Sequence, residues 1–462
     1  MRSVNPATGE LLAEYPEHSA AEARQRLERC HDAFTDWSRL AVEARTAVLA
    51  AAAGLLRERR AELARLATLE MGKTLGAAES EVDKCALACD FYAQRAAGML
   101  APERVPGNAT DSTIAYVRFD PLGVLLAIMP WNFPYWQAFR AAAPALAAGN
   151  TVALKHASNV CGCALAMERL WRDAGAPEHA FTTLLVPGAQ ASALVAHEAV
   201  AAVTLTGSEP AGEAVARAAG ANLKKVVLEL GGSDPFIVLA DADVAPAARQ
   251  AAVARTINNG QSCIAAKRFI VDARVADAFE SDFAAALAAL RVGDPLDRDT
   301  DVGPLARADL VDELERQLQA SVAAGARAVL PGGRLARPGW WFAPALLADV
   351  RPGMPAFDEE TFGPLAALIR ARDTADAIAL ANRSRYGLAA SVWTADVQAA
   401  HELAKSLEVG GVFINATVRS DPRLPFGGVR RSGHGRELGN FGIREFVNVK
   451  TVWAEGRPAE VS

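Results

Sequence analysis

The stretch AAVTLTGSEPAGEAVARAAGANLKKVVLELGG, residues 201–232, decides the fold class of this chain. Residues 201–206 form a short apolar run typical of a buried strand, residues 213–219 repeat apolar side chains at helical spacing, and residues 225–230 form a second apolar run. A strand, a helix and a strand in this order make a βαβ unit, in which the two strands run parallel. The stretch therefore predicts a parallel sheet and an α/β fold.

The same alternation extends in both directions from this unit. Strands are predicted at residues 124–129 and 151–154, with a helix over residues 136–148 between them, and the alternation continues to about residue 415. Ser19-Ala20-Ala21-Glu22 is a capping-box pattern, and we expect the first hundred residues to be mostly helical. Residues 444–453 alternate like a terminal strand, which either pairs with another protomer or folds back on its own chain.

Composition limits the possible functions. The chain has 462 residues, of which 51% are hydrophobic and 22% charged, so it can form two or three domains of about 100 to 200 residues. Its net charge of −6 argues against a nucleic-acid partner, which needs a concentrated basic face. No apolar stretch reaches the roughly 18 residues of a membrane helix, and the N-terminal residues lack a signal-peptide run. We therefore expect a cytoplasmic protein with no membrane partner.

Six cysteines are too few for a disulfide framework in a chain of this length. Cys85 and Cys89 lie one helical turn apart, and Cys161 and Cys163 are close in sequence, but no histidine lies at a zinc-type spacing from either pair. Packing as small hydrophobic side chains explains these four residues better than a metal does, and no metal site is predicted.

Cys263 is the cysteine that carries the predicted chemistry. Cys263 ends the segment NGQSC, Glu229 ends an apolar strand before two glycines, and Asn132 lies in the segment PWNFP. A thiolate attacks carbonyl groups well, a side-chain amide can hold the resulting oxyanion, and a partly desolvated carboxylate can activate water. Singly, a core thiol and a helix cap are adequate explanations for Cys263 and Asn132. Together, the three residues predict acyl chemistry.

These segments resemble the signature motifs of the NAD(P)-dependent aldehyde dehydrogenase superfamily, and the resemblance covers essentially the whole chain. Further matches are NPATGE (5–10), EMGK (70–73), TGS (206–208), EETFGP (359–364), PFGG (425–428) and SG (432–433). The resemblance implies an aldehyde dehydrogenase-like α/β fold with a modified Rossmann cofactor domain, an α/β catalytic domain and a small β oligomerisation arm. It places the dinucleotide-binding domain at residues 1–111 and 122–230, the catalytic domain at 231–439, and the arm at 112–121 and 440–462. A homodimer or homotetramer is implied.

The same resemblance assigns the catalytic steps. The Cys263 thiolate adds to an aldehyde, the thiohemiacetal expels a hydride to nicotinamide, and a thioester remains. Asn132 and the Cys263 N–H hold the oxyanion, and Glu229 activates the water that hydrolyses the thioester. The presence of this acid argues against a coenzyme-A-acylating relative, in which a thiol takes the acyl group.

The expected cofactor is NADP or NAD. Gly207 and Gly212 frame a turn between a strand and a helix without the usual Gly-x-Gly-x-x-Gly spacing, which is weak evidence alone. Ser208 and the helix N-terminus offer free N–H groups to a pyrophosphate. The resemblance places the lysine at 155 on the adenine ribose and the glutamate at 360 on the nicotinamide ribose. It also adds these lining residues: Trp131, Leu230 and Phe362.

One departure from the family pattern bears on cofactor choice. Ser158 stands three residues after Lys155, where many NAD-preferring members place a glutamate that accepts from the ribose 2′-hydroxyl. Without that acid nothing repels a 2′-phosphate, and Lys155 can pair with it. We therefore predict that NADP is accepted, with NAD as the other candidate cofactor.

The substrate is predicted to carry a carboxylate. Arg140 lies two helical turns beyond Asn132, and it matches the arginine that semialdehyde dehydrogenases acting on succinate semialdehyde use to bind the distal carboxylate. Ser420 matches their substrate loop, with Arg423 as a second cation. The remaining predicted substrate contacts are Trp136 and Phe426. A surface arginine that bridges helices is the alternative explanation for Arg140.

Two further positions complete the comparison with that group, the bacterial NAD(P)-dependent succinate semialdehyde dehydrogenases. Ile257 replaces a second arginine found in some of them, which leaves glutarate semialdehyde or an uncharged aldehyde as alternative substrates. Ala265 replaces the second cysteine of a redox-regulated subset, so we expect no disulfide switch at Cys263. A non-catalytic binding protein on this fold and a Cys-His hydrolase are the other classes considered, and neither explains the three chemical residues.

Overall fold

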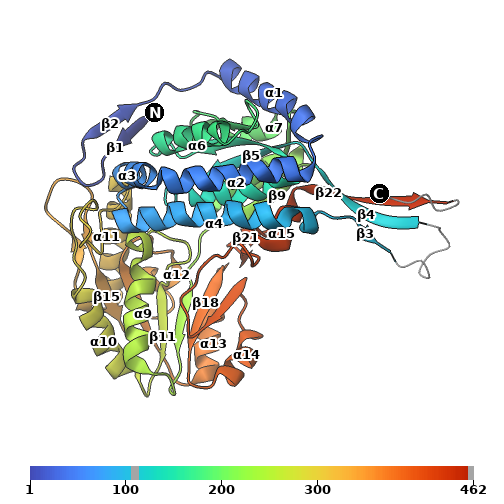
Figure 1. Ribbon diagram of the computed structural model, residues 1–462. Helices are drawn as coiled ribbons and strands as arrows, with labels where there is room; N and C mark the ends of the chain where they lie inside the picture. The colour runs from blue at the N-terminus through green and yellow to red at the C-terminus, as the bar shows by residue number, and fades with distance from the viewer. Residues whose placement is uncertain (106–113, 456–462) are drawn as a thin grey trace.

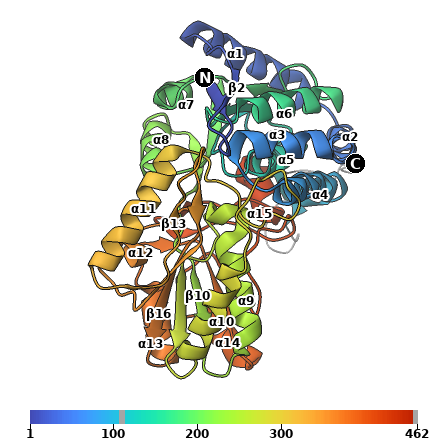
Figure 2. The ribbon, with the colours of Figure 1, turned by 90° about the vertical axis from the view of Figure 1, so that its left-hand side faces the viewer.

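The computed structural model describes residues 1–105 and 114–455, and two large sheets occupy separate halves of it (Figures 1 and 2). The first sheet has the strand order β21-β9-β8-β5-β6-β7. Its strands are β5 (Val124–Met129), β6 (Thr151–His156), β7 (Phe181–Thr183), β8 (Val200–Thr206), β9 (Lys225–Glu229) and β21 (Gly433–His434). The first five are parallel, and β21 is antiparallel to β9. The predicted α/β class and parallel sheet are confirmed.

The strand order reverses at β5. The chain passes from β5 to β6 and β7 on one side, then returns to place β8 and β9 on the other side. In open parallel sheets, ligands bind outside the carboxyl ends of the strands at such a reversal. The segments that follow β5 and β8 are therefore expected to form a binding crevice.

Helices cover both faces of the first sheet. Leu125 and Met129 of β5 pack under α2, α4, α5 and α6, whereas Leu126 and Ile128 pack against α1, α7 and α8. Burial on both faces explains why β5 is a continuous apolar run. The helices are α1 (Ala20–Trp37), α2 (Val42–Glu58), α3 (Arg60–Met71), α4 (Leu75–Met99), α5 (Trp136–Ala148), α6 (Cys161–Asp173), α7 (Ala191–Ala196) and α8 (Glu209–Ala221).

The N-terminal region follows its prediction closely. Ser19 accepts from the backbone N–H of Glu22, whose carboxylate accepts from the N–H of Ser19, so the capping box opens α1 as expected. The start of α8 was predicted wrongly, because this helix begins at Glu209 and not at residue 213. Pro210 lies in the first turn of this helix, where its missing N–H has no partner to lose.

The second sheet has the order β12-β15-β16-β11-β10-β18-β19, in which all neighbours are parallel except β12 and β15. Its strands are β10 (Pro235–Val238), β11 (Arg268–Asp272), β12 (Arg327–Leu330), β15 (Ala345–Ala348), β16 (Leu365–Ala371), β18 (Ala389–Trp393) and β19 (Gly411–Ile414). Its helices are α9 (Val244–Thr256), α10 (Ala276–Ala288), α11 (Ala308–Ala323), α12 (Pro355–Asp358), α13 (Thr374–Asn382) and α14 (Val397–Ala404). Aromatic rings of Phe236, Phe269 and Phe283 pack together in its core.

A third, three-stranded sheet projects from the body of the molecule (Figure 1). In it β22 (Val447–Ala454) pairs antiparallel with β4 (Ile114–Pro121), which also pairs with β3 (Glu103–Arg104). The tail strand thus pairs within its own chain, and it begins later than predicted because residues Gly439–Glu445 form α15. Residues 106–113 and 456–462, part of which were assigned to the arm, lie outside the described residues.

The remaining elements are small. They are β1 (Arg2–Val4) with β2 (Leu11–Glu14), β13 (Gly333–Arg334) with β14 (Phe342–Ala343), and β17 (Tyr386–Gly387) with β20 (Val429–Arg430). In the described ranges no helix is long and apolar enough to cross a membrane. The same part of the chain brings together no group of three or more His, Cys, Asp and Glu side chains able to hold a metal ion.

Candidate active site

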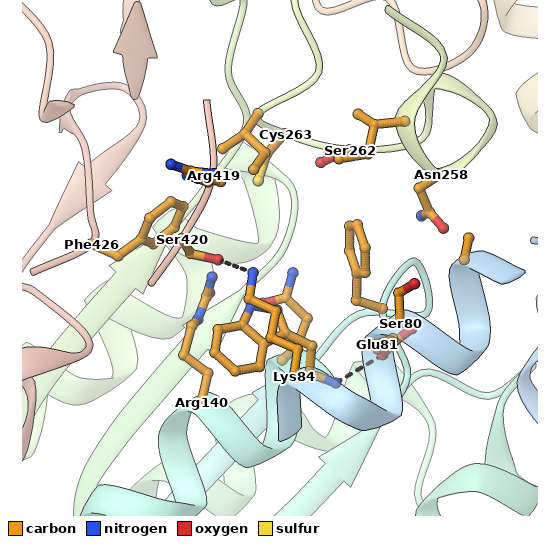
Figure 3. Close-up of a pocket in the computed structure, with 16 residues that line it drawn as sticks. Ser80, Glu81, Lys84, Arg140, Asn258, Ser262, Cys263, Arg419, Ser420 and Phe426 are labelled. Carbon is orange, nitrogen blue, oxygen red and sulfur yellow. Dashed lines mark hydrogen bonds between the residues drawn. The ribbon is translucent and has the colours of Figure 1, made fainter. Parts of the chain in front are cut away.

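Two cavities meet at Cys263. The first, of about 330 Å³, is lined by α4, α5 and the segment around residues 419–426, as Figure 3 shows. The second, of about 240 Å³, is lined by the segments that follow β5, β8 and β9. Cys263 and Gln137 line both cavities. The thiol therefore stands where a molecule in the first cavity can contact one in the second.

The loop that carries Cys263 has an unusual backbone. Asn258, Asn259 and Gly260 have φ values of 55°, 59° and 76°, in the left-handed region that few residues adopt. Asparagine tolerates this region because its side chain can bond to nearby backbone, and Asn258 Nδ2 donates to the carbonyl of Gln261 at 3.1 Å. A Cβ at Gly260 would overlap the backbone of Gly363. The sequence NNG is therefore required by the shape of the loop.

Lys267 fixes the other side of this loop. Its buried ammonium donates to the carbonyl oxygens of Ser262 at 2.8 Å and Cys263 at 2.7 Å. It also lies 3.6 Å from Oε1 of Glu360, which accepts from the N–H of Gly232 at 2.9 Å. A single cation thus connects the loop that carries Cys263 to a carboxylate that lines the second cavity.

The Cys263 side chain is half-buried, and it is a free thiol like the other five cysteines, which are buried. Burial raises the pKa of Cys263 to about 12, although the charges of Lys267 and Arg140 favour the thiolate. The resting side chain is therefore protonated at neutral pH.

Asn132 reaches the loop that carries Cys263 from the segment after β5. Its side-chain Nδ2 donates to the backbone carbonyl of Gln261 at 3.0 Å, and its backbone carbonyl accepts from Asn258 Nδ2 at 2.7 Å. One Nδ2 hydrogen remains for a ligand, because the amide group carries two. Asn132 and Cys263 line the second cavity together.

Buried polar groups hold the segment of Asn132 in place. Oε1 of Glu81 accepts from the N–H groups of Tyr135 and Trp136 at 2.7 and 2.8 Å, at the start of α5. The His156 ring contacts the carbonyls of Met129 and Pro134 at 3.2 and 2.8 Å. Burial lowers the pKa of His156 to about 4, so this ring is neutral at physiological pH. Glu81 and His156 were not predicted as site residues.

Glu229 ends β9 with its side chain buried, outside the lining of both cavities. Its Oε1 has no hydrogen-bond partner among the described residues. Burial raises the pKa of Glu229 well above its ordinary value, Arg140 opposes the shift, and Glu437 adds to it. A carboxyl group in these surroundings takes up a proton far more readily than an exposed one.

The predicted cofactor residues divide into two groups. The second cavity is lined by Trp131, Gly207, Ser208, Leu230, Glu360 and Phe362. Lys155 lies at the carboxyl end of β6 beside β5, and Ser158 is exposed in the turn that follows. Gly212 was wrongly placed in the turn, because it lies in the first turns of α8, where a Cβ would collide with Leu230.

All four predicted substrate residues line the first cavity: Arg140, Trp136, Ser420 and Phe426. Ile257 also lines it, whereas the second predicted cation, Arg423, is exposed and pairs with Asp421 at 2.7 Å. Arg140 is buried, forms an ion pair with Glu437 and donates to Thr206 Oγ1 at 3.1 Å. The charge of Arg140 is therefore compensated by the carboxylate of Glu437. The position of Arg140 in the sequence did not predict this contact.

Two cations of the first cavity were also missed. Lys84 of α4 and Arg419 both line it, and Lys84 Nζ donates to Ser420 Oγ at 2.7 Å (Figure 3). Residues 84 and 420 are 336 positions apart, and an isolated lysine on a helix usually indicates a solvated face. No signal in the sequence distinguished Lys84 from the other lysines.

Comparisons with known proteins match nearly the whole length of this chain. The family model for the aldehyde dehydrogenase family matches residues 1–452. A probable succinate-semialdehyde dehydrogenase (NADP+) of Synechocystis sp. is 51% identical over 98% of this chain and 99% of that protein. Succinate-semialdehyde dehydrogenase (NADP+) 1 of Mycobacterium tuberculosis is 47% identical over the same shares.

A solved structure shows the same fold. The crystal structure of succinic semialdehyde dehydrogenase from Streptococcus pyogenes in complex with NADP+ is 36% identical and has a TM-score of 0.95. The match covers 98% of this chain and 100% of that one. The fold class predicted from the sequence is confirmed.

The raised pKa of Cys263 predicts how the free protein reacts with iodoacetamide. Only the thiolate is alkylated, so the alkylation rate of Cys263 should rise about tenfold per pH unit between pH 7 and 10. Mass spectrometry of the peptide that contains Cys263 measures the rate, and the buried Cys89 serves as the internal control. A rate that levels off near pH 7 would show instead that the loop stabilises the thiolate.

Proposed function

The chain belongs to the aldehyde dehydrogenase family, and we propose that it oxidises succinate semialdehyde to succinate with NADP as the hydride acceptor. The observation that carries the proposal is the position of Cys263, which lines both a cavity with cationic side chains and a cavity at the strand-order reversal. The names of its relatives support this substrate over glutarate semialdehyde and uncharged aldehydes.

The oxidation requires a covalent bond to Cys263. The Cys263 thiol loses its proton to solvent as its sulfur adds to the aldehyde carbon, and the carbonyl electron pair moves to the oxygen. We assign the stabilisation of that oxyanion to Asn132 Nδ2 and to the N–H of Cys263, which makes no hydrogen bond in the described residues. Bound NADP would supply the acceptor for the hydride that leaves the same carbon as the oxyanion electron pair re-forms the carbonyl. Cys263 then carries a thioester.

Glu229 is assigned to release of the acid. A carboxylate with a raised pKa can take a proton from water as the water attacks the thioester, which frees succinate and returns the Cys263 thiol. The side chain must turn towards the thiol for this step, since it lies outside the cavity lining here. Gly427 beside Glu229 Oε1 leaves room for movement, because it has no side chain.

The second cavity carries groups that suit the pyrophosphate and nicotinamide-ribose parts of a dinucleotide. Ser208 caps α8 without a side-chain hydrogen bond to the helix, so the first N–H groups of α8 are available to a pyrophosphate. Glu360, held by Gly232 and Lys267, would bind the nicotinamide ribose. Lys155 with Ser158 would accommodate the 2′-phosphate, since position 158 carries no acid.

We assign the distal carboxylate to the first cavity. Arg140 Nη1 makes no hydrogen bond to the described residues and can donate to it, alongside the hydroxyl of Ser420. Trp136 and Phe426 supply apolar walls for the carbon chain. The centroid of the Phe426 ring lies 4.8 Å from Cζ of Arg140, so the ring packs against the guanidinium.

The proposed function gives a role to each of the three parts of the chain. We propose that residues 1–111 and 122–230 bind the dinucleotide, that residues 231–439 form the catalytic domain, and that the projecting sheet joins two copies of the chain. β22 lies at the edge of that sheet, with Val449 and Trp453 more than half exposed. An exposed strand edge with apolar side chains is a ready pairing surface.

Steady-state kinetics test the proposed function. With NADP, kcat/KM for succinate semialdehyde should exceed that for butanal at least about tenfold, because a charge-assisted hydrogen bond contributes about 1.5 to 3 kcal/mol. C263S should lose essentially all activity with both aldehydes. Equal kcat/KM values for the two aldehydes would contradict the substrate, and an active C263S would contradict the mechanism.

Substitution of Glu229 separates the two half-reactions. E229Q cannot take a proton from water, so the first turnover should release about one NADPH per chain, and steady turnover should then fall by about 10² to 10⁴. Stopped-flow absorbance at the NADPH band measures both phases, and E213Q, an exposed position on α8, is the control. Slow turnover without the first burst would place Glu229 before hydride transfer.

Cofactor choice can be altered at one position. S158E places a carboxylate where the 2′-phosphate is expected, so kcat/KM for NADP should fall at least about tenfold relative to that for NAD. S158Q is the matched neutral control and should change the ratio much less. If both variants change it equally, size and not charge is responsible.

A further inference from the structure

Lys84 occupies a position in the first cavity that the mechanism above does not use. It projects from α4 over the ring of Trp136, with Nζ at 4.3 Å from the ring centroid, and donates to Ser420 Oγ at 2.7 Å. Figure 3 shows its amino group beside Ser420, in the cavity whose far side carries Cys263. An ammonium group at this place faces the end of any aldehyde whose carbonyl is at Cys263.

The charges around Lys84 are balanced among themselves. Arg140 is paired with Glu437, and Asp421 is paired with Arg423. Glu81 is paired with Lys73 and accepts from the start of α5. Lys84 itself has no carboxylate within 4.0 Å among the residues that the structure describes. Among the described residues, Lys84 and Arg419 therefore line the cavity without a carboxylate partner, and Lys84 is the more buried of the two, since Arg419 is exposed.

A largely buried ammonium without an anion is unfavourable. Burial lowers the pKa of Lys84 to about 8, and the neighbouring charge of Arg140 acts in the same direction. Only one of the three ammonium hydrogens is used, by Ser420. A bound carboxylate would supply the missing counter-charge and accept a second hydrogen.

We propose that Lys84 is a specificity-determining residue that binds the distal carboxylate of the substrate, with Ser420 held beside it as a second donor. This proposal rests on the proposed function, because it requires an aldehyde with a carboxylate. Arg140 then has a divided role: it neutralises Glu437 and reaches the substrate with one amino group, while Lys84 supplies the net charge that distinguishes an acid from an uncharged aldehyde.

The first test compares two aldehydes with the same number of carbon atoms. At pH 7 with saturating NADP, K84M should lower the ratio of kcat/KM for succinate semialdehyde to that for butanal by about 10- to 100-fold. K84R keeps the charge and should recover most of the ratio, and K405M, at an exposed lysine that follows the last residue of α14, should leave it unchanged. An unchanged ratio in K84M, whether from equal losses or from none, would overturn the proposal.

The second test uses the wild-type protein and needs no variant. Lys84 is charged below about pH 8 and neutral above it, so the same ratio should be high at pH 7 and fall as pH rises through about 8 to 9.5. Ionisation of Cys263 affects both aldehydes alike and cancels in the ratio. The other charged or titratable groups that face Lys84 are Glu81, Cys85, Arg140 and Asp421.

K84R gives the comparison for the pH test, since arginine keeps its charge throughout this range. Its ratio should stay flat with pH, and a fall that is equal in wild type and K84R would overturn the proposal. Failure of the proposed function looks different, because wild type would then show no preference for succinate semialdehyde at pH 7 in the first place.

Discussion

The buried ammonium of Lys267 is the interaction on which the arrangement of the site depends. It holds the carbonyls of Ser262 and Cys263 and faces Glu360, so a single charge organises the nucleophile loop and one wall of the neighbouring cavity. Three consecutive left-handed residues precede this loop, and such backbone persists only where surrounding contacts determine it strongly. Lys267 on one side and Asn132 on the other provide those contacts.

The order of the strands explains why residues so distant in sequence meet here. The carboxyl ends of β5, β8 and β9 bring Asn132, Ser208 and Leu230 to one edge of the first sheet. The segments that lead into β11 and β16 of the second sheet bring Cys263 and Glu360 to the same place. The site therefore lies between the carboxyl ends of strands in the first sheet and the amino ends of strands in the second sheet. Both sheets must form before the site is complete.

Local sequence signals predicted the elements and the chemistry better than the long-range contacts. Strand β5 and helix α5 have the predicted bounds because their apolar patterns and flanking glycine are local. Glycine spacing misplaced Gly212, since a helix starting with Glu209-Pro210 gives no glycine signal at its true start. Glu437, Lys267 and Lys84 escaped prediction, because each acts through a partner or cavity that only the folded chain brings near.

The two cavities on either side of Cys263 have a consequence for the sequence of events in turnover. In the proposed mechanism, an acyl group attached to the sulfur extends into the first cavity, whose lining includes side chains of α4 and α5. The proposed cofactor site is the second cavity, so exchange of the cofactor would leave the acyl group in place. An acyl group held in the first cavity therefore would not block the exchange of a cofactor in the second cavity.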